Sequence, residues 1–152
     1  MSYRRIENEL QKISFKNVSW KRDQHIVSIT LAPQWIVTLK NLETYPFKPP
    51  FIFVNERSYT DFLRLCSQRF SQTFRRWYPH TCCLRCESFD CPYRWNVMCN
   101  FTKIIEEIQD YAKKKWMIYR MVQMESCFRH YHIPDDVHRQ IFSFLDERIV
   151  GI

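Results

Sequence analysis

Residues 45–50 read Tyr-Pro-Phe-Lys-Pro-Pro and hold three of the seven prolines in this 152-residue chain. The residue before a proline avoids the helical region, so both Tyr45 and Pro49 are expected to be extended. Proline also lacks a backbone N–H donor, which excludes it from helix interiors and central strands. The stretch therefore predicts a stiff surface bend between two apolar runs.

The segments on either side of this bend have the composition and alternation of β-strands. The expected strands are residues 18–23, 25–31 and 35–42 before the bend and 51–54 after it. Ahead of them, Ile6, Leu10 and Ile13 fall on one face of a predicted helix over 4–13. This order predicts an α+β fold in which a four-stranded antiparallel meander is flanked by helices.

The second half of the chain is predicted to be helical apart from one irregular segment. Helical spacing of apolar residues extends over 59–77, whereas 78–94 contains two prolines and four cysteines and is expected to be a loop. Asn100 is a suitable N-cap for a long helix that follows, and 133–136 begins a last helix. We expect a core at 1–125 with a helical insertion at 59–77, and a C-terminal helical extension at 126–152.

Composition narrows the class of protein. Apolar residues make up 45% of the chain and aromatic residues 16%, enough for a packed core. Gly151 is the single glycine, which argues against the glycine-rich loops that cradle nucleotide phosphates. The charged N-terminal segment does not resemble a secretion signal, so we expect a cytoplasmic or nuclear protein with reduced cysteines and no membrane contact.

The net charge of +7 admits acidic partners, nucleic acid among them. The basic residues are scattered along the sequence, however, which favours a solvated surface. We therefore do not expect nucleic acid to be a partner. We also expect the protein to be a monomer.

The predicted helix, meander, bend and further strand together resemble the ubiquitin-conjugating enzyme family. Members carry apolar residues six, eight and ten positions before the tyrosine of the bend, which here are Leu39, Val37 and Trp35. They also carry an active-site Cys-Leu, a later tryptophan and then a helix, matched here by Cys83-Leu84, Trp95 and the segment around Ile104. The resemblance covers about 4–54 and 83–111. It extends to divergent members encoded by large DNA viruses.

The resemblance implies transfer of ubiquitin or a relative through a cysteine thioester, with an activating enzyme and a ligase as partners and no required cofactor. One family motif, His-Pro-Asn, whose asparagine stabilises the oxyanion, is absent, and Tyr78-Pro79-His80 lies near its place. The Ser-Pro that follows the family's tryptophan is replaced by Asn96-Val97. The bend also fits inactive ubiquitin-binding variants and RWD domains, so a non-catalytic binding module is the competing hypothesis.

Three interpretations of the cysteine-rich segment stay open. Thioester chemistry needs one exposed thiol, for which Cys83 is the first candidate and Cys86 the second. A zinc site is the alternative, because Cys-x-x-Cys spacing suits a tetrahedral ion; its candidate ligands are His80, Cys82, Cys83, Cys86 and Cys91. The third interpretation is that these cysteines are simply small buried residues.

Further residues are candidates for contact with partners. In the family, the residue at the position of Phe47 is exposed and meets ligases, and Pro49 beside it keeps the tip rigid. Arg4 and Arg5 on the first helix are candidates for contact with the activating enzyme. Trp95 is counted with this surface, although support of the active-site loop is its more common role.

Overall fold

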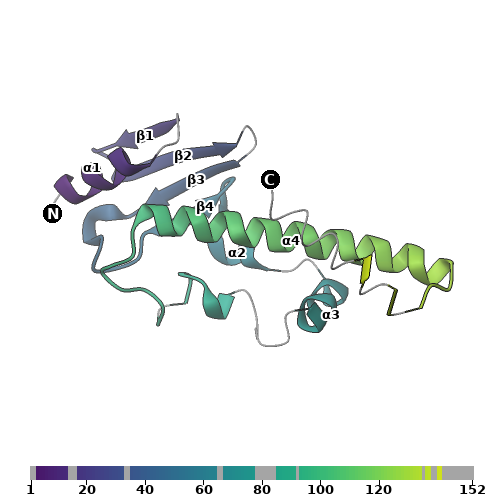
Figure 1. The fold of residues 1–152 in the computed structure, drawn as a ribbon. Coiled ribbons are helices and arrows are strands. Elements are labelled where there is room, and N and C mark those ends of the chain that lie inside the picture. Colours follow the sequence, from purple (N-terminus) through teal and green to yellow (C-terminus); the bar gives the residue numbers. More distant parts are fainter. Residues whose placement is uncertain are drawn as a thin grey trace. The chain divides into compact units, whose positions relative to one another are not determined.

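We describe a computed structural model of the chain, covering residues 3–13, 17–32, 35–64, 67–77, 85–91, 93–134, 136–137 and 140–141 (Figure 1). Its contacts divide it into two compact units. The sheet unit comprises residues 1–64 and 81–111, and the helical unit comprises 65–80 and 112–152. Each unit is described by itself.

The sheet unit is built on an antiparallel sheet in which neighbours in sequence are neighbours in space. Its strands are β1 (Val18–Lys21), β2 (Ile26–Ala32), β3 (Trp35–Lys40), β4 (Phe51–Val54) and β5 (Arg57–Ser58). The α+β class and the antiparallel meander are thus confirmed. The expected number of strands was wrong, because the sheet has five and not four.

The strand that sequence reasoning missed, β5, follows a tight turn without glycine. Asn55 and Glu56 both have positive φ, 48° and 66°, as the favoured two-residue hairpin turns require. Asparagine tolerates this region and glutamate does so less well, so the usual Asn-Gly signal is absent. Two hydrogen bonds stabilise the turn in this conformation: Asn55 N donates to the carbonyl of Ile36 at 2.9 Å, and Ile36 N donates to Asn55 Oδ1 at 2.8 Å.

The core of the sheet unit lies on one face of the sheet. Register places Val27 opposite Leu39 and Ile29 opposite Val37, and Leu39 in turn opposite Ile52, all of them buried. Helix α1 (Tyr3–Lys12) adds Ile6, and the first half of α4 (Phe101–His130) adds further buried residues: Phe101, Ile104, Ile105 and Ile108. Each such side chain contributes about 1.5–3 kcal/mol by burial, which explains why these apolar positions specify the register.

The helix expected over 59–77 is two helices, which corrects that prediction. Helix α2 (Tyr59–Leu63) ends at Arg64, whose backbone is extended, and α3 (Gln68–Trp77) begins after Ser67. Both starts have a serine cap: Ser58 Oγ accepts from the N–H of Asp61 at 3.2 Å, and Ser67 Oγ accepts from the N–H of Phe70 at 3.4 Å. Serine favours such caps over helix interiors, so Ser67 restarts the helix.

Helix α4 confirms the long helix expected after Asn100. The Asn100 side chain accepts from the N–H of Lys103 at 2.9 Å, as an N-cap does. No glycine or proline interrupts the 30 residues. At its end, His132 takes a positive φ of 53° while Ile133 N bonds the carbonyl of Phe128 and His132 N bonds that of Arg129. This is a Schellman motif, with histidine in the place that glycine usually takes.

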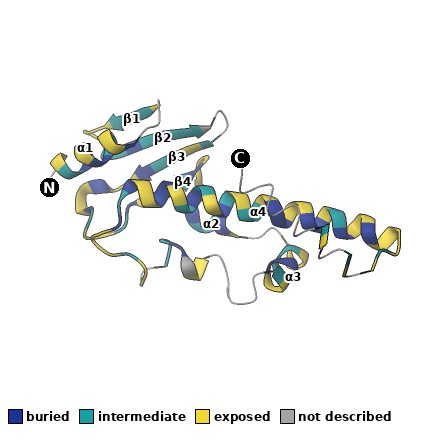
Figure 2. Cartoon of the chain, in the orientation of Figure 1, coloured by how far each residue is buried: buried dark blue, intermediate teal, exposed yellow. Residues whose placement is uncertain are grey.

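The helical unit consists of α3 and the second half of α4, followed by residues up to 141 of which Asp136, Val137, Gln140 and Ile141 are helical. One cluster packs Met117, Met121 and Phe128 against further apolar side chains: Trp77, Met124, Ile133 and Ile141. Arg69 of α3 donates to the carbonyl of Val122 and to Ser126 Oγ. Figure 2 shows buried and exposed residues alternating along α4, as expected for a helix with one buried face.

Candidate functional site

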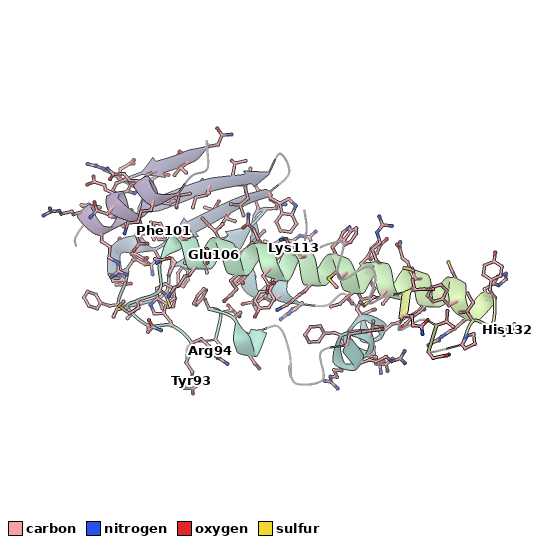
Figure 3. The ribbon with its side chains drawn as sticks, viewed as in Figure 1. Tyr93, Arg94, Phe101, Glu106, Lys113 and His132 are labelled. Atoms are coloured by element: carbon pink, nitrogen blue, oxygen red, sulfur yellow. The ribbon has the colours of Figure 1, made fainter. Side chains whose placement is uncertain are left out.

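A buried carboxylate, that of Glu9, fixes the proline bend to two helices of the sheet unit. Glu9 Oε2 accepts from the hydroxyl of Tyr45 at 2.5 Å and from the N–H of Phe101 at 3.0 Å. Its other oxygen accepts from Arg5 Nε at 2.8 Å. Phe101 begins α4 (Figure 3), so the negative charge lies where the positive end of the helix dipole favours it. Burial, and then the hydrogen bond to Glu9, raise the pKa of Tyr45, which holds this hydroxyl as a donor.

The bend itself is supported from behind by Trp95. The Tyr45–Pro46 peptide is cis, and Trp95 Nε1 donates to the carbonyl of Pro46 at 2.9 Å. The ring of Tyr45 lies 6.0 Å from that of Trp95 and 4.9 Å from that of Phe101. This packing leaves Phe47 at the tip with 80% of its surface exposed, and the expectation of a fixed, protruding aromatic is confirmed. Trp95 is half-buried and acts as support.

A shallow groove of about 470 Å³ lies between α1 and the segment leading into α4. Arg4 and Lys12 supply exposed cations there, and Val97 and Met98 supply exposed apolar surface. Arg5 is engaged within the chain, because its Nη2 donates to the carbonyls of Val97 at 2.6 Å and Cys99 at 3.2 Å. Burial, the largest single cause, would lower the pKa of Arg5, but the hydrogen bond to Glu9 together with the charges of Tyr45 and Glu9 outweighs it and the pKa is raised.

Cys86 lies in the short helix η2 (Arg85–Glu87), and its side chain is exposed. The residues that follow it are held by Asp90, whose carboxylate accepts from Arg85 Nε at 2.7 Å and from Thr60 Oγ1 at 2.9 Å. Ser88 is buried and donates to the carbonyl of Arg85 at 2.9 Å. The thiol is thus reachable from solvent while the backbone beneath it is fixed.

Glu107 anchors the same loop to α4. It accepts from the hydroxyl of Tyr59 at 2.5 Å and from the backbone N–H of Phe89 at 3.0 Å. Burial, and then the charge of Glu107, raise the pKa of Tyr59. The ring of Phe89 meets Trp95 edge-on at 5.9 Å, so the cysteine loop and the proline bend share one support. Tyr93 and Arg94 project from the loop between them (Figure 3).

The sequence predictions for the cysteines are resolved in part. Cys86 is exposed and Cys91 is half-buried, while Cys83, Cys82 and His80 lie outside the described residues. Within the described part of the chain, no three His, Cys, Asp or Glu side chains gather in a way that would hold a metal ion. The buried-cysteine hypothesis is therefore wrong for Cys86, and the full zinc set stays a prediction.

Sequence reasoning missed the carboxylates that organise this site. Glu9 lies three residues after Ile6 and four before Ile13, on the apolar face of its helix, and a charged residue there signals a buried carboxylate. Glu107 likewise lies between Ile104 and Tyr111 at helical spacing. Asp90 gave no comparable signal, because its partners Arg85 and Thr60 meet it only in the folded loop.

We compared the chain with protein-family models, with curated proteins and with solved structures, and it matches none of them. Among the described helices, none is both long and apolar enough to cross a membrane.

Proposed function

We propose that this chain accepts ubiquitin or a ubiquitin-like protein from an activating enzyme as a cysteine thioester and passes it to a lysine with the help of a ligase. The observation that supports this most is the exposed Cys86 on a loop held by Glu107 and Asp90. A thioester carrier needs a thiol that a protein C-terminus can reach and a backbone that keeps it in place.

The proposed chemistry consists of two acyl transfers. The thiolate of Cys86 attacks the carbonyl of the incoming thioester; a new C–S bond forms while the C–S bond to the activating enzyme breaks and its thiolate leaves. A lysine amine then attacks the new thioester, loses a proton and forms an amide, and the Cys86 thiolate departs. Cys83, outside the described residues, is the alternative nucleophile. Neither transfer needs a cofactor.

The second transfer is expected to be slow. Its tetrahedral intermediate carries an oxyanion, and the His-Pro-Asn motif that supplies a donor in the family is absent here. Loss of one oxyanion donor typically costs about 100- to 1,000-fold in rate. We therefore expect thioester formation to be readily detected and discharge to lysine to be slow.

Phe47 favours a second candidate, a binding module of the same fold. Its exposed ring and the groove beside Arg4 offer an anchor and a charged rim for a partner, and neither requires a thiol. In this alternative a zinc ion on Cys91 and neighbouring cysteines replaces catalysis, and elemental analysis would find about one zinc per chain, as a single tetrahedral site requires.

The test is incubation of the full chain with activating enzyme, ATP and ubiquitin, analysed on a non-reducing gel. We expect a thiol-sensitive adduct that Cys86→Ala abolishes and Cys86→Ser converts into a more stable ester. Cys127→Ala is the matched control, since Cys127 is also exposed but lies on the second half of α4. Circular dichroism verifies that each variant folds.

Two outcomes would contradict this assignment. An adduct that survives Cys86→Ala but not Cys83→Ala would move the nucleophile to Cys83, and no adduct with any activating enzyme would favour the binding module. Phe47→Ala then separates the roles: charging should persist while ligase-dependent discharge falls. Phe51→Ala, which removes another exposed aromatic ring, is its control.

A further inference from the structure

Most of the chain's net positive charge lies in the helical unit, because acidic residues are fewer there. Its two stretches carry ten basic and five acidic side chains, so they hold +5 of the chain's net charge of +7. Between residues 112 and 134 the only acidic residue is Glu125, which is buried against Arg76. Every exposed charged residue of α4 beyond 111 is therefore basic.

Aromatic side chains accompany these cations on one face of α4. Lys113, Trp116 and Arg120 recur at intervals of three and four residues, which places them on neighbouring turns of the same face. Trp116 is 47% exposed and Tyr119, three residues on, is 48% exposed. The guanidinium of Arg120 lies 5.0 Å from the centre of the Trp116 ring. Lys113 projects from the helix in Figure 3.

Helix α3 completes this surface. Phe70 stacks on Tyr119 with ring centres 5.9 Å apart and planes 28° from parallel, and so holds the tyrosine ring in place. We call Lys113, Trp116, Tyr119 and Arg120 the basic aromatic patch.

We propose that the basic aromatic patch binds single-stranded nucleic acid. Cations at Lys113 and Arg120 attract the phosphates, and the rings of Trp116 and Tyr119 offer faces on which unpaired bases stack. Proteins that bind single strands without sequence preference combine these same two elements. The proposal does not depend on thioester chemistry, because none of these residues belongs to the sheet unit.

Other polyanions fit the patch less well. An anionic membrane would need an apolar helix face to insert, but that face of α4, with Met117, Ile118 and Met121, is buried in the unit's own core. In a duplex the bases are stacked on one another, so a duplex would contact the cations but could not stack on the aromatic rings. An acidic protein would likewise need only the charges.

Fluorescence anisotropy of the full chain with labelled single-stranded DNA and RNA, each of about 12 nucleotides, tests the proposal. Binding should weaken as salt rises, and each lost phosphate contact should reduce the log–log salt slope by about 0.7. Trp116→Ala should weaken binding about 5- to 150-fold, as loss of one stacking platform does. Lys113→Ser with Arg120→Ser should weaken it and flatten the salt slope.

The matched control is Lys21→Ser with Lys40→Ser, which removes two exposed cations from the sheet unit and should leave affinity unchanged. The proposal is overturned by a lack of binding at low salt, or by binding that ignores the patch substitutions. Equal affinity for duplex DNA with no effect of Trp116→Ala would overturn the stacking role. Preference for polyglutamate or for vesicles of anionic lipid would assign the patch to a different partner.

Discussion

Among the described residues, each unit buries one carboxylate, and the two carboxylates have different surroundings. Glu9 in the sheet unit is 8% exposed and accepts hydrogen bonds from three groups, two of them the buried hydroxyl of Tyr45 and the backbone N–H of Phe101. Glu125 in the helical unit is 4% exposed, yet among the described residues it pairs only with Arg76, a side chain that is itself largely exposed. Two carboxylates that are similarly buried can therefore differ in how much the stability of their unit depends on them.

This difference shows that the two units hold their exposed residues in place in different ways. In the sheet unit, polar networks centred on Glu9, Asp90 and Glu107 tie distant segments into one geometry, as a thiol loop and a protruding bend require. In the helical unit, α3 is held on α4 by apolar packing, by the hydrogen bonds of Arg69 and by the ion pair of Arg76 with Glu125, and the exposed face of α4 carries charge. The proposed acyl transfer needs fixed atoms, whereas the electrostatic attraction to a flexible polyanion proposed for the helical unit needs no single geometry.

The strongest test of this contrast is removal of each buried carboxylate. Glu9→Ala leaves the buried N–H of Phe101 without its acceptor and leaves the hydroxyl of Tyr45 with only a longer bond, 3.3 Å, to the carbonyl of Cys99, so the sheet unit should lose about 2 kcal/mol or more of stability. Glu125→Ala frees an exposed arginine that water can solvate, and the expected cost is below about 1 kcal/mol. Hydrogen exchange with mass spectrometry resolves the two units, with β2–β4 reporting on one and α3 on the other.

Glu9→Gln is the control, because it keeps the size and one carbonyl acceptor and should fall between wild type and alanine. A loss from Glu125→Ala as large as that from Glu9→Ala would break the contrast. So would protection in the sheet strands that survives Glu9→Ala unchanged.

A smaller effect, on the rate of thioester formation, is expected from loosening the loop that bears Cys86. Glu107→Ala releases the N–H of Phe89 and the hydroxyl of Tyr59, so the loop bearing Cys86 should sample other positions. A misplacement of about 1 Å can cost about 100-fold in rate, and we expect thioester formation to slow by about 10- to 100-fold. Glu106→Ala, at an exposed position on the same turn of α4 (Figure 3), should leave the rate unchanged.

Rapid-quench charging assays at saturating activating enzyme separate this effect from weaker binding. The expected change is in the maximal rate, and Glu107→Gln should restore part of it because its amide oxygen still accepts from the N–H of Phe89. Equal losses for Glu106→Ala and Glu107→Ala would remove the positioning role.

Much of the fold could be predicted because local pattern and packing agree. Strand β4 was expected at its observed bounds, and α1, β2 and β3 within one or two residues, because their apolar positions alternate or recur in one phase. The prediction of one helix over 59–77 was wrong because the apolar periodicity continues across the break between α2 and α3. A single capping residue, Ser67, is a weaker signal in the sequence than the apolar stripe on either side of it. The β5 hairpin was missed because Glu56 occupies a position that glycine usually marks.

The site was predictable in its exposed parts and not in its supports. A protruding Phe47 follows from the prolines around it, and an exposed thiol was expected in a proline-containing loop. The carboxylates of Glu9 and Glu107 act through partners 36 and 48 residues away, Tyr45 and Tyr59, and no local pattern encodes such pairs. The division of net charge between the two units likewise depends on the tertiary fold, which joins residues 65–80 to 112–152.

The smallest expected effect concerns these two tyrosines and appears only in alkali. Burial, followed by the nearby carboxylates, raises the pKa of both Tyr45 and Tyr59 above the usual value of about 10. Above that pH the unfolded chain releases these protons while the folded sheet unit retains them, so rising pH favours unfolding. The stability that the two tyrosines contribute is therefore fully present below about pH 10, and it falls by about 1.4 kcal/mol per pH unit for each tyrosine above that pH.

In urea unfolding followed by circular dichroism between pH 9 and 11, Tyr45→Phe with Tyr59→Phe should lower stability at pH 9 and flatten its alkaline decline. Tyr93→Phe, at an almost fully exposed tyrosine of the same unit, should leave the decline unchanged. If the double variant declines as steeply as wild type, the carboxylate networks do not control the proton affinity of these hydroxyls, and the contrast between the two units loses its electrostatic basis.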